Sequence, residues 1–576
     1  MASSTGYTLV LFVLLFANII IINLWWNQDV LYMKRFATVQ PLPIPKGVTS
    51  GNLYNASPAE PETSHSHPLC PNRKLRNIPH FSYPPATPRQ WATHMDTTSG
   101  TLSRFTIVND KESYSVCDQL ELLIEARNGY DEPKTYGGDF FSAKIFTQNG
   151  SFIAGSGTDG EVLDLGNGNY SAFFTLKWAG TVRINVTLIV PSEAVFEQQN
   201  LKETLQPLVN YLGKFSKKID GKDVAEEVRC GHVPVDRLTS ICNLSNPYVG
   251  LTWYCQKPNS SLLSCADWTE VTSLPYDTNK MIEDQAYSRR SSVVHRPAAP
   301  IVGLPNHVTV NSESDDFINE QVDRLLVCGR QHAHFQVIPW VAGFYRNKRW
   351  FPPTCKVKLF TGKECKKCLA NKNIYIYGDS TIRQAYSQLV KLSGAKYPAG
   401  QFIGPVDTYV AEHNIHLHYS FHNIPILHKN FWHKLSILRF VTNELDAIGS
   451  NETVVVVISL WAHFQAVTRP LYEQRIKSIA DAARRLLNRN PTAVVMFKGG
   501  NTQNPYGSRV QYANDHYARD NEEALRRILK SYPKIQFIDA WDMSRGQLAP
   551  ADTHPPEPHL SNLIDQILTI ACPRSI

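Results

Sequence analysis

The C-terminal half of the chain alternates short apolar runs with amphipathic stretches. Residues 454–459 (Val-Val-Val-Val-Ile-Ser) and 493–497 (Ala-Val-Val-Met-Phe) are apolar almost throughout, which is typical of parallel strands buried on both faces. Residues 374–377 and 535–538 are shorter strand candidates. Apolar side chains at helical spacing occupy residues 382–390, 476–487, 524–529 and 560–568. Strands that alternate with helices predict a doubly wound, mostly parallel sheet with a site at its carboxyl edge.

Earlier in the chain the pattern is that of antiparallel strands. Residues 170–178 and 182–190 alternate apolar with polar or small side chains over most of their length, and Gly166-Asn167-Gly168 supplies the residues of a tight hairpin turn. Short alternating strands with glycine-rich turns predict a β-sandwich. Residues 196–300 show little regular pattern but contain Cys230, Cys242, Cys255 and Cys265. Disulfides are expected to hold this region, and three pairings of the four cysteines are open.

The length of 576 residues exceeds what one core supports and predicts two to four domains. The patterns divide the chain into five segments. Residues 1–27 form a signal anchor or signal peptide, and 28–100 a proline-rich stem. They are followed by the sandwich at 101–195, the cysteine-rich region and linker at 196–300, and the α/β domain at 301–576.

Residues 9–26 are the one stretch of membrane length. No small-residue cleavage site follows, which favours an uncleaved anchor over a signal peptide. Lys34 and Arg35 follow the segment, and the positive-inside rule would then place the body of the chain in the cytoplasm. We give more weight to the downstream glycosylation acceptors and to eleven cysteines, which indicate a type II Golgi membrane protein or a secreted one. The acceptors are Asn55, Asn149, Asn169, Asn185, Asn243, Asn259 and Asn451.

A net charge of +7 is modest for this length and argues against a nucleic-acid partner. Nine basic residues between 346 and 372 are expected to form a solvated surface; the alternative is a surface that attracts an anionic glycan or the phosphates of an acyl donor. Cys365-Lys-Lys-Cys368 favours a disulfide with Cys355 or Cys328 over a zinc site. An odd number of cysteines leaves at least one thiol free or paired between chains. No metal is expected, and the histidines are assigned to strands and loops; they are His413, His416, His418 and His422.

Candidate chemistry begins where the strand at 374–377 ends. Gly378 allows a sharp bend, and Ser380 then lies at the start of a helix, where unpaired backbone N–H groups can stabilise an oxyanion. A hydroxyl in that place needs a nearby base to become a nucleophile. The alternative for Ser380 is a helix N-cap.

The second half of the candidate site lies near the C-terminus, in Ala551-Asp552-Thr553-His554-Pro555-Pro556. Because carboxyl ends of parallel strands share one edge, His554 can meet Ser380 there and deprotonate it, and Asp552 can orient the imidazole. Taken alone, His554 is equally a solvated loop histidine and Asp552 a turn residue. Their occurrence together with strand-Gly-Asp-Ser favours a hydrolase-type site.

These residues resemble a known family. Gly378-Asp379-Ser380-x-x-Arg383 with the terminal Asp-x-His-Pro-Pro is similar to the PC-esterase branch of the SGNH, or GDSL-type, hydrolases. Residues 164–171 and 180–186 resemble the last strands of filamin-type immunoglobulin repeats. From about residue 70 onward the chain resembles the neurexophilin and PC-esterase domain family. The implied fold is an immunoglobulin-like sandwich followed by a three-layer α/β domain.

The resemblance implies glycan O-acyl chemistry, including O-acetylation of sialic acid. Ser380 is then the nucleophile, His554 the base and Asp552 its partner, with Gly378, Asp379 and Arg383 as further site candidates. The common spacing in the SGNH superfamily is Asp-x-x-His, so the shorter spacing here puts the role of Asp552 in doubt. The usual oxyanion asparagine block is missing, and the replacement candidates are Asn501 and His463.

We therefore expect a serine-dependent O-acetyltransferase or esterase with a glycan or glycoprotein substrate. No permanently bound cofactor is expected, and acetyl-CoA is a candidate donor. The alternative is a non-catalytic neurexophilin-like glycoprotein that binds a cell-surface receptor and retains a silent hydrolase domain.

Overall fold

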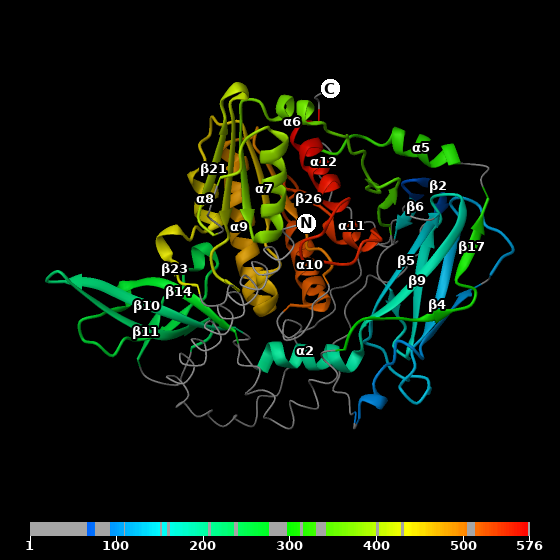
Figure 1. Cartoon of the computed structure of the whole chain (residues 1–576), viewed down its shortest axis with the longest axis horizontal. Coiled ribbons are helices and arrows are strands. Elements are labelled where there is room, and N and C mark those ends of the chain that lie inside the picture. The colour runs from blue at the N-terminus through cyan, green and yellow to red at the C-terminus, as the bar shows by residue number, and fades with distance from the viewer. Residues whose placement is uncertain are drawn as a thin grey trace, which may run out of the picture. The chain divides into compact units, whose positions relative to one another are not determined.

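A computed structural model describes residues 66–74, 91, 93–108, 110–149, 152–157, 162–204, 209–234, 240–275, 296–311, 315–329, 341–398, 403–427, 431–503 and 513–573. They belong to one compact unit (Figure 1). The expected membrane segment at 9–26, most of the expected stem and Asn55 lie outside these residues. Within the described ranges, no helix has both the length and the apolar character that crossing a bilayer requires.

Two mainly antiparallel sheets pack face to face at the N-terminal end of the described chain. The first sheet orders its strands as β16 (Val302–Gly303), β3 (Arg104–Val108), β4 (Gln119–Glu125), β8 (Asn169–Thr175) and β7 (Leu163–Asp164). Among the strands described in the two sheets, only β16 and β3 pair in parallel. The second orders β15 (Ala299–Pro300), β9 (Gly180–Val190), β5 (Phe140–Asn149), β6 (Phe152–Gly157), β18 (Phe344–Arg346) and β19 (Arg349–Phe351), and β17 (His307–Val310) also pairs with β9. Alternate residues such as Leu122, Phe174 and Val186 meet in one buried core, so the alternation in the sequence is confirmed.

The chain after residue 301, where the α/β domain was expected to begin, first contributes strands to the paired sheets. Strands β15 to β19 come after the cysteine-rich region, yet β15 and β17 pair with β9, β16 pairs with β3, and β18 pairs with β6. These strands have two to four residues each, too few for their alternation to be recognised in the sequence. The paired sheets therefore take strands from both sides of the cysteine-rich region.

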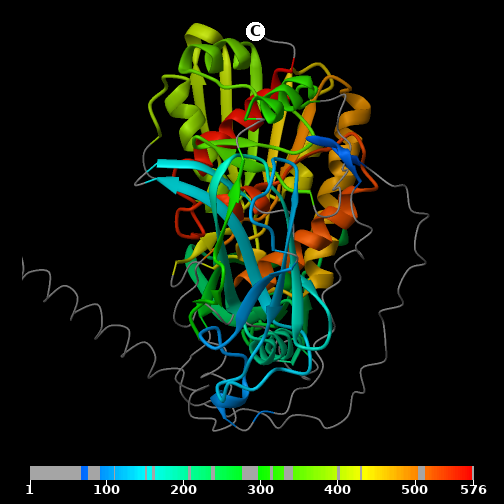
Figure 2. The same cartoon turned by 90° about the vertical axis from the view of Figure 1, so that its right-hand side faces the viewer.

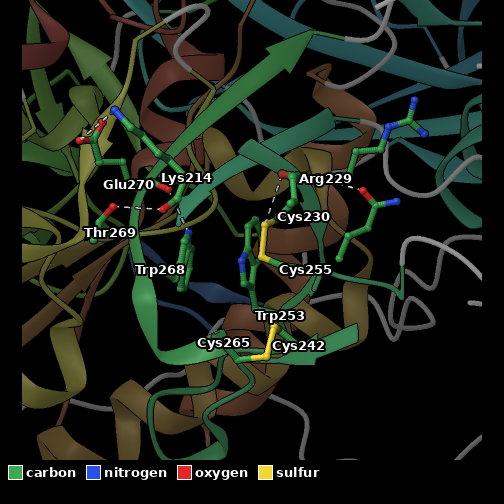
Figure 3. The surroundings of a disulfide bond; sticks show 12 residues. Lys214, Arg229, Cys230, Cys242, Trp253, Cys255, Cys265, Trp268, Thr269 and Glu270 are labelled. Carbon is green, nitrogen blue, oxygen red and sulfur yellow. Dashed lines mark hydrogen bonds and ion pairs between the residues drawn. A yellow bond between two sulfur atoms is a disulfide. The ribbon is translucent and has the colours of Figure 1, made fainter. Parts of the chain in front are cut away.

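The cysteine-rich region forms a third sheet, although its sequence predicted little regular structure. Its order is β12 (Ile241–Asn243), β13 (Tyr254–Gln256), β11 (Lys222–Gly231), β10 (Val209–Ile219), β14 (Trp268–Pro275) and β23 (His433–Lys434). Of the three open pairings, the structure has Cys230–Cys255 and Cys242–Cys265. Figure 3 shows both disulfides beside Trp253, whose ring stacks on Trp268 with centroids 6.0 Å apart. The disulfides and Trp253 belong to a buried core that also contains Tyr211, Phe215 and Val271.

The C-terminal region contains the predicted parallel sheet. Its order is β21 (Val406–Val410), β22 (Ile415–Phe421), β20 (Lys372–Gly378), β24 (Val454–Ser459), β25 (Val494–Lys498) and β26 (Gln536–Ile538), with β21 alone antiparallel. Helices α6 (Gly362–Leu369), α7 (Ser380–Leu392) and α12 (His559–Ala571) pack on one face (Figure 1). Helices α8 (Val441–Ala447), α9 (Arg469–Arg489) and α10 (Asp515–Leu529) pack on the other.

Helix α2 (Ser192–Thr204), seen almost end-on in Figure 2, follows directly after β9. Glu193 in its first turn is fully buried and accepts a hydrogen bond from the Lys134 ammonium at 2.7 Å. In the middle of the helix, the Tyr517 hydroxyl of α10 donates to the carbonyl of Gln198. Helix α2 is therefore fixed both to the paired sheets and to the α/β region.

Three further disulfides complete the covalent framework. Cys70 in β2 (Cys70–Lys74), which follows β1 (Ser66–His67), pairs with Cys117. Cys328, which follows α5 (Asp315–Arg324), pairs with Cys355, and Cys368 of α6 pairs with Cys572. The partner expected for the Cys365/Cys368 motif is therefore wrong: Cys355 and Cys328 pair with each other. Cys365 is the free thiol and is buried.

Candidate active site at the carboxyl edge of the parallel sheet

Ser380 lies where the central strand β20 ends. Strands β22 and β24 flank β20 in parallel register, with Gly378 opposite Phe421 on one side and Ser459 on the other. The chain segments that follow β22, β20, β24, β25 and β26 therefore approach one edge of the sheet. Ser380 is half-buried there as the first residue of α7.

Gly378 is required by the close approach of β24. Its φ of +150° lies in the glycine-favouring region, and a Cβ at this position would lie 2.0 Å from the carbonyl oxygen of Ser459 and 2.8 Å from Cγ2 of Ile382. The neighbour is main chain in the middle of a sheet and cannot move aside. Gly378 therefore allows the backbone conformation that places Ser380 at the sheet edge.

We expect Gly378→Ala to destabilise the protein by about 1–3 kcal/mol, because the new methyl group overpacks the sheet. A shift of the urea-unfolding midpoint measures this effect. Gly500→Ala is the comparison, since a Cβ there meets Trp461 at an ordinary distance of 3.6 Å. Equal midpoints for the two variants would contradict the steric explanation.

Asp379, and not Ser380, caps helix α7. Its buried carboxylate accepts hydrogen bonds from the backbone N–H of Thr381 at 2.9 Å and from the Thr381 hydroxyl at 2.6 Å. Its other oxygen accepts from the N–H of Ala462 at 2.9 Å, in the turn after β24. Asp379 thus fixes two neighbouring loops beside Ser380. The capping alternative for Ser380 does not apply.

His554 lies beside Ser380. Its Nε2 is 2.8 Å from the Ser380 Oγ, although the two residues are 174 positions apart in the sequence. His554 belongs to the segment between α11 (Ala540–Gly546) and α12, and its side chain is exposed. A neutral imidazole at this distance can accept the hydroxyl proton of serine, which is the geometry that nucleophile activation needs.

Asp552 has a different contact from the one expected. Its Oδ1 accepts a hydrogen bond from the backbone N–H of His554 at 2.8 Å, and the residue is exposed. This bond closes a local turn two residues long. Asp552 therefore shapes the loop that carries His554, and the short Asp-x-His spacing explains why its carboxylate reaches the main chain.

Asn501 lies in the turn after β25 and is fully buried. Its Nδ2 donates to the carbonyl oxygens of Asp552 at 3.0 Å, Thr553 at 3.4 Å and Thr502 at 3.1 Å. Its Oδ1 accepts from the ammonium of Lys498 at 3.3 Å. The amide hydrogens are thus directed to backbone carbonyls, so the geometry does not support the expected role of Asn501 as an oxyanion donor.

His463 is packed among other rings. It lies in the short 3₁₀ helix after β24, with its ring centroid 5.4 Å from that of His422 and 5.2 Å from that of Phe421. Burial lowers the pKa of His422 well below its usual range, and the charge of the neighbouring Arg475 acts in the same direction. Both histidines are buried, so His463 is enclosed by neighbouring side chains.

Arg383 lies one turn along α7 from Ser380, and its backbone N–H donates to the carbonyl of Asp379. The helix fixes its position relative to Ser380, and its side chain is half-buried. Burial raises the pKa of the neighbouring Tyr419, and the positive charge of Arg383 partly opposes this shift. Arg383 therefore supplies a cation close to the strand end that presents Ser380.

Lys498 and Trp461 lie in strand-end segments at the same sheet edge, and the sequence suggested no role for either. The indole N–H of Trp461 donates to the Thr381 hydroxyl at 2.9 Å, one residue from Ser380. Lys498 is buried at the end of β25 and lies over the Trp461 ring. Lys498 ends a strand whose other residues are all apolar, and this was the feature of the sequence that could have identified it.

Several side chains of the basic stretch between residues 346 and 372 bond to other groups of the protein. Lys356 pairs with Asp323, the ammonium of Lys358 donates to the carbonyl of Pro573 at 3.1 Å, and Lys372 donates to the carbonyl of Cys368. Lys356, Lys358 and Lys372 are thus bonded within the protein, whereas Lys363 and Lys367 on α6 are exposed.

Five of the glycosylation acceptors have described side chains. Asn243, Asn259 and Asn451 are exposed, while Asn169 and Asn185 are half-buried on strands. Asn149 ends β5. Asn185 also lines a cavity of about 530 Å³ on the second of the paired sheets, with Phe146, Arg183 and His307. The residues that line this cavity do not include Ser380 or His554.

Two family models match the chain, and together they cover most of the described residues. The model "Neurexophilin" matches residues 102–276, which contain most of the paired sheets and the cysteine-rich sheet. The model "NXPE family member 4-like, C-terminal domain" matches residues 350–572, which contain the parallel sheet and the Ser380–His554 pair. The matches support a relationship to the neurexophilin and NXPE-related family. Together with five disulfides, they indicate a disulfide-bonded glycoprotein of the secretory pathway.

Proposed function

The chain is related to neurexophilins and NXPE proteins and has a serine beside a histidine at a sheet edge. We propose that this protein is a glycan O-acetyltransferase or esterase. The observation that carries the proposal is the 2.8 Å separation of Ser380 Oγ and His554 Nε2. In this proposal the C-terminal region is a PC-esterase domain of the SGNH type, and the paired sheets are an immunoglobulin-like module. The half-buried serine and exposed histidine leave the pair accessible to a large substrate.

The proposed reaction has two halves. Ser380 Oγ attacks the acetyl carbonyl carbon of the donor while His554 takes the hydroxyl proton. With a thioester donor such as acetyl-CoA, the carbon–sulfur bond breaks and the thiol leaves with that proton. A sugar hydroxyl then gives its proton to His554 and attacks the acyl carbon. The bond between that carbon and Ser380 Oγ breaks, and His554 returns the proton to Oγ. Water in place of the sugar gives hydrolysis.

Backbone geometry supplies one oxyanion donor in this proposal. The N–H of Ser380 lies at the start of α7, where helical amides have no partner within the helix. The partial positive charge of the helix N-terminus adds to this stabilisation. Sialic acid on a glycoprotein is the acceptor we favour, from the family resemblance, and the compartment is the Golgi lumen or the cell exterior.

The proposal is tested with the full-length protein purified from a secretory expression host. Turnover is measured with an activated acetyl ester, and separately with a sialylated mucin and acetyl-CoA. A fluorophosphonate, which modifies activated serines, reports on Ser380 without knowledge of the substrate. We expect ester turnover and labelling of Ser380, identified by peptide mass spectrometry. Absence of both would overturn the proposal.

The neurexophilin match favours a second candidate function for the N-terminal half. Residues 102–276 would then bind a cell-surface receptor, and the C-terminal region would have no activity. Absence of labelling, together with saturable binding of the protein to cell surfaces, is the result that this alternative expects.

A further inference from the structure

The turn after β25 connects the two halves of the candidate site. Lys498 is the last residue of β25, and Gly499, Gly500 and Asn501 follow it. The N–H of Gly499 donates to the carbonyl of Ile538 at 3.0 Å, and the N–H of Gly500 donates to the buried Glu522 carboxylate at 2.8 Å. A Cβ at Gly499 would lie 2.6 Å from that carboxylate. The turn is thus held by the neighbouring strand end and by α10.

From this fixed turn, the side chain of Asn501 reaches the loop that carries His554. Its Nδ2 donates to the carbonyl oxygens of Asp552 and Thr553, the two residues before His554. Rotating the amide by 180° would place Oδ1 against these carbonyls and the amide nitrogen against the Lys498 ammonium. The hydrogen-bonding partners on both sides therefore determine the orientation of the amide.

Lys498 holds the other side of the Asn501 amide. Its ammonium donates to Oδ1 of Asn501 at 3.3 Å and to the carbonyl of Gly499 at 2.9 Å. Burial lowers the pKa of Lys498 to about 8, and the carboxylates of Asp379 and Glu522 oppose this shift. Asp379 is also the N-cap of the helix that begins with Ser380. Lys498 thus interacts electrostatically with Asp379, which precedes Ser380, and donates a hydrogen bond to Asn501, which contacts the loop of His554.

We propose that Lys498 and Asn501 form a positioning pair that holds His554 within hydrogen-bonding distance of Ser380. This inference rests on the proposed function and assigns Asn501 a role other than oxyanion stabilisation. Asn501 acts through the imidazole, because its contacts are with the main chain that carries His554. A displacement of about 1 Å at a reacting group costs on the order of 100-fold in rate, which sets the expected size of the effect.

The test uses the rate constant for fluorophosphonate labelling of Ser380, followed from pH 5 to 9. Asn501→Leu keeps the approximate shape and removes the amide, and Lys498→Met removes the donor to Oδ1. We expect each variant to label about 100-fold more slowly. The sigmoidal pH dependence that a nearby imidazole produces should be replaced by a rate that rises with hydroxide. An oxyanion donor would lower the rate but leave the sigmoid in place.

A double-mutant cycle with His554→Ala separates the two roles. If Asn501 acts through His554, adding Asn501→Leu to His554→Ala lowers the labelling rate no further. Multiplicative effects would overturn the proposal, as would labelling of Asn501→Leu at the wild-type rate. Wild-type protein that is not labelled at all would instead reject the proposed function, so the two failures are distinguishable.

Asn490→Leu is the matched control. Asn490 is also buried, and its amide donates to the carbonyl oxygens of Gly449 and Glu452 at the opposite end of the strands. We expect this variant to lose stability but to label at the wild-type rate. A comparable loss of labelling rate in Asn490→Leu would show that general destabilisation, and not positioning, explains the Asn501 result.

Discussion

Replacing Ser380 by alanine is expected to lower ester turnover by several orders of magnitude and to abolish fluorophosphonate labelling. The hydroxyl oxygen is the atom that forms the acyl bond in the proposed reaction, and loss of the nucleophile in comparable serine enzymes removes about 10⁶ in kcat. The measurement is kcat for acetyl ester hydrolysis, together with transfer to a sialylated mucin followed by mass spectrometry.

The fold should tolerate this substitution, which makes the result interpretable. Asp379 provides the N-cap of α7, and the Ser380 hydroxyl contacts His554 in an accessible place. The free energy of unfolding is therefore expected to change by no more than about 0.5 kcal/mol. Ser387→Ala, two turns along the same helix, is the control and should retain full activity, because its hydroxyl donates to the carbonyl of Arg383. Unchanged turnover in Ser380→Ala would reject a serine mechanism.

Removing the Cys368–Cys572 disulfide is expected to cause the largest loss of stability. The bond closes a sequence separation of 204 residues, which contains the whole parallel sheet. In the chain-entropy description a loop of this length contributes about 5 kcal/mol to the free energy of unfolding. We expect Cys368→Ala/Cys572→Ala to lower the urea-unfolding midpoint accordingly.

Cys365 makes the choice of variant important. It is buried three residues before Cys368 on α6 and is the free thiol, so Cys368→Ala alone leaves two thiols near each other that can pair. The double variant avoids this pairing, and Cys365→Ala is the matched control for the loss of a buried sulfur on the same helix. A double variant no less stable than the control would contradict the expected contribution of the bond.

The sequence predicted the parallel sheet because β24 and β25 are buried on both faces and hence continuously apolar. The meeting of Ser380 and His554 was predictable for the same reason, since strand order brings their segments to one edge. The contacts of Asp552 and Asn501 could not be predicted from the sequence, because a carboxylate or amide in a turn bonds equally well to a ring, a ligand or the main chain. Strands β15 to β19 were missed since two to four residues carry no periodicity.

The disulfide pairing shows a similar limit. Cys328 and Cys355 lie 27 residues apart and pair with each other, whereas Cys368 pairs across 204 residues. Proximity in the sequence favoured pairing of the Cys365/Cys368 motif with Cys355 or Cys328. Only the packing of α6 beside α12 brings Cys368 and Cys572 together.

The late return of β15 to β19 to the paired sheets has a consequence for biosynthesis. Strand β9 leaves the ribosome well before its partners β15 and β17, and β6 well before β18. At 5–20 residues per second, the roughly 160 residues between the ends of β9 and β19 take on the order of ten seconds to translate. During that interval β9, β6 and β3 each present an unpaired edge, and such edges are templates for association with other chains. Efficient secretion of this protein should therefore depend on lumenal chaperones that bind the emerging sheets until residue 351 has been added.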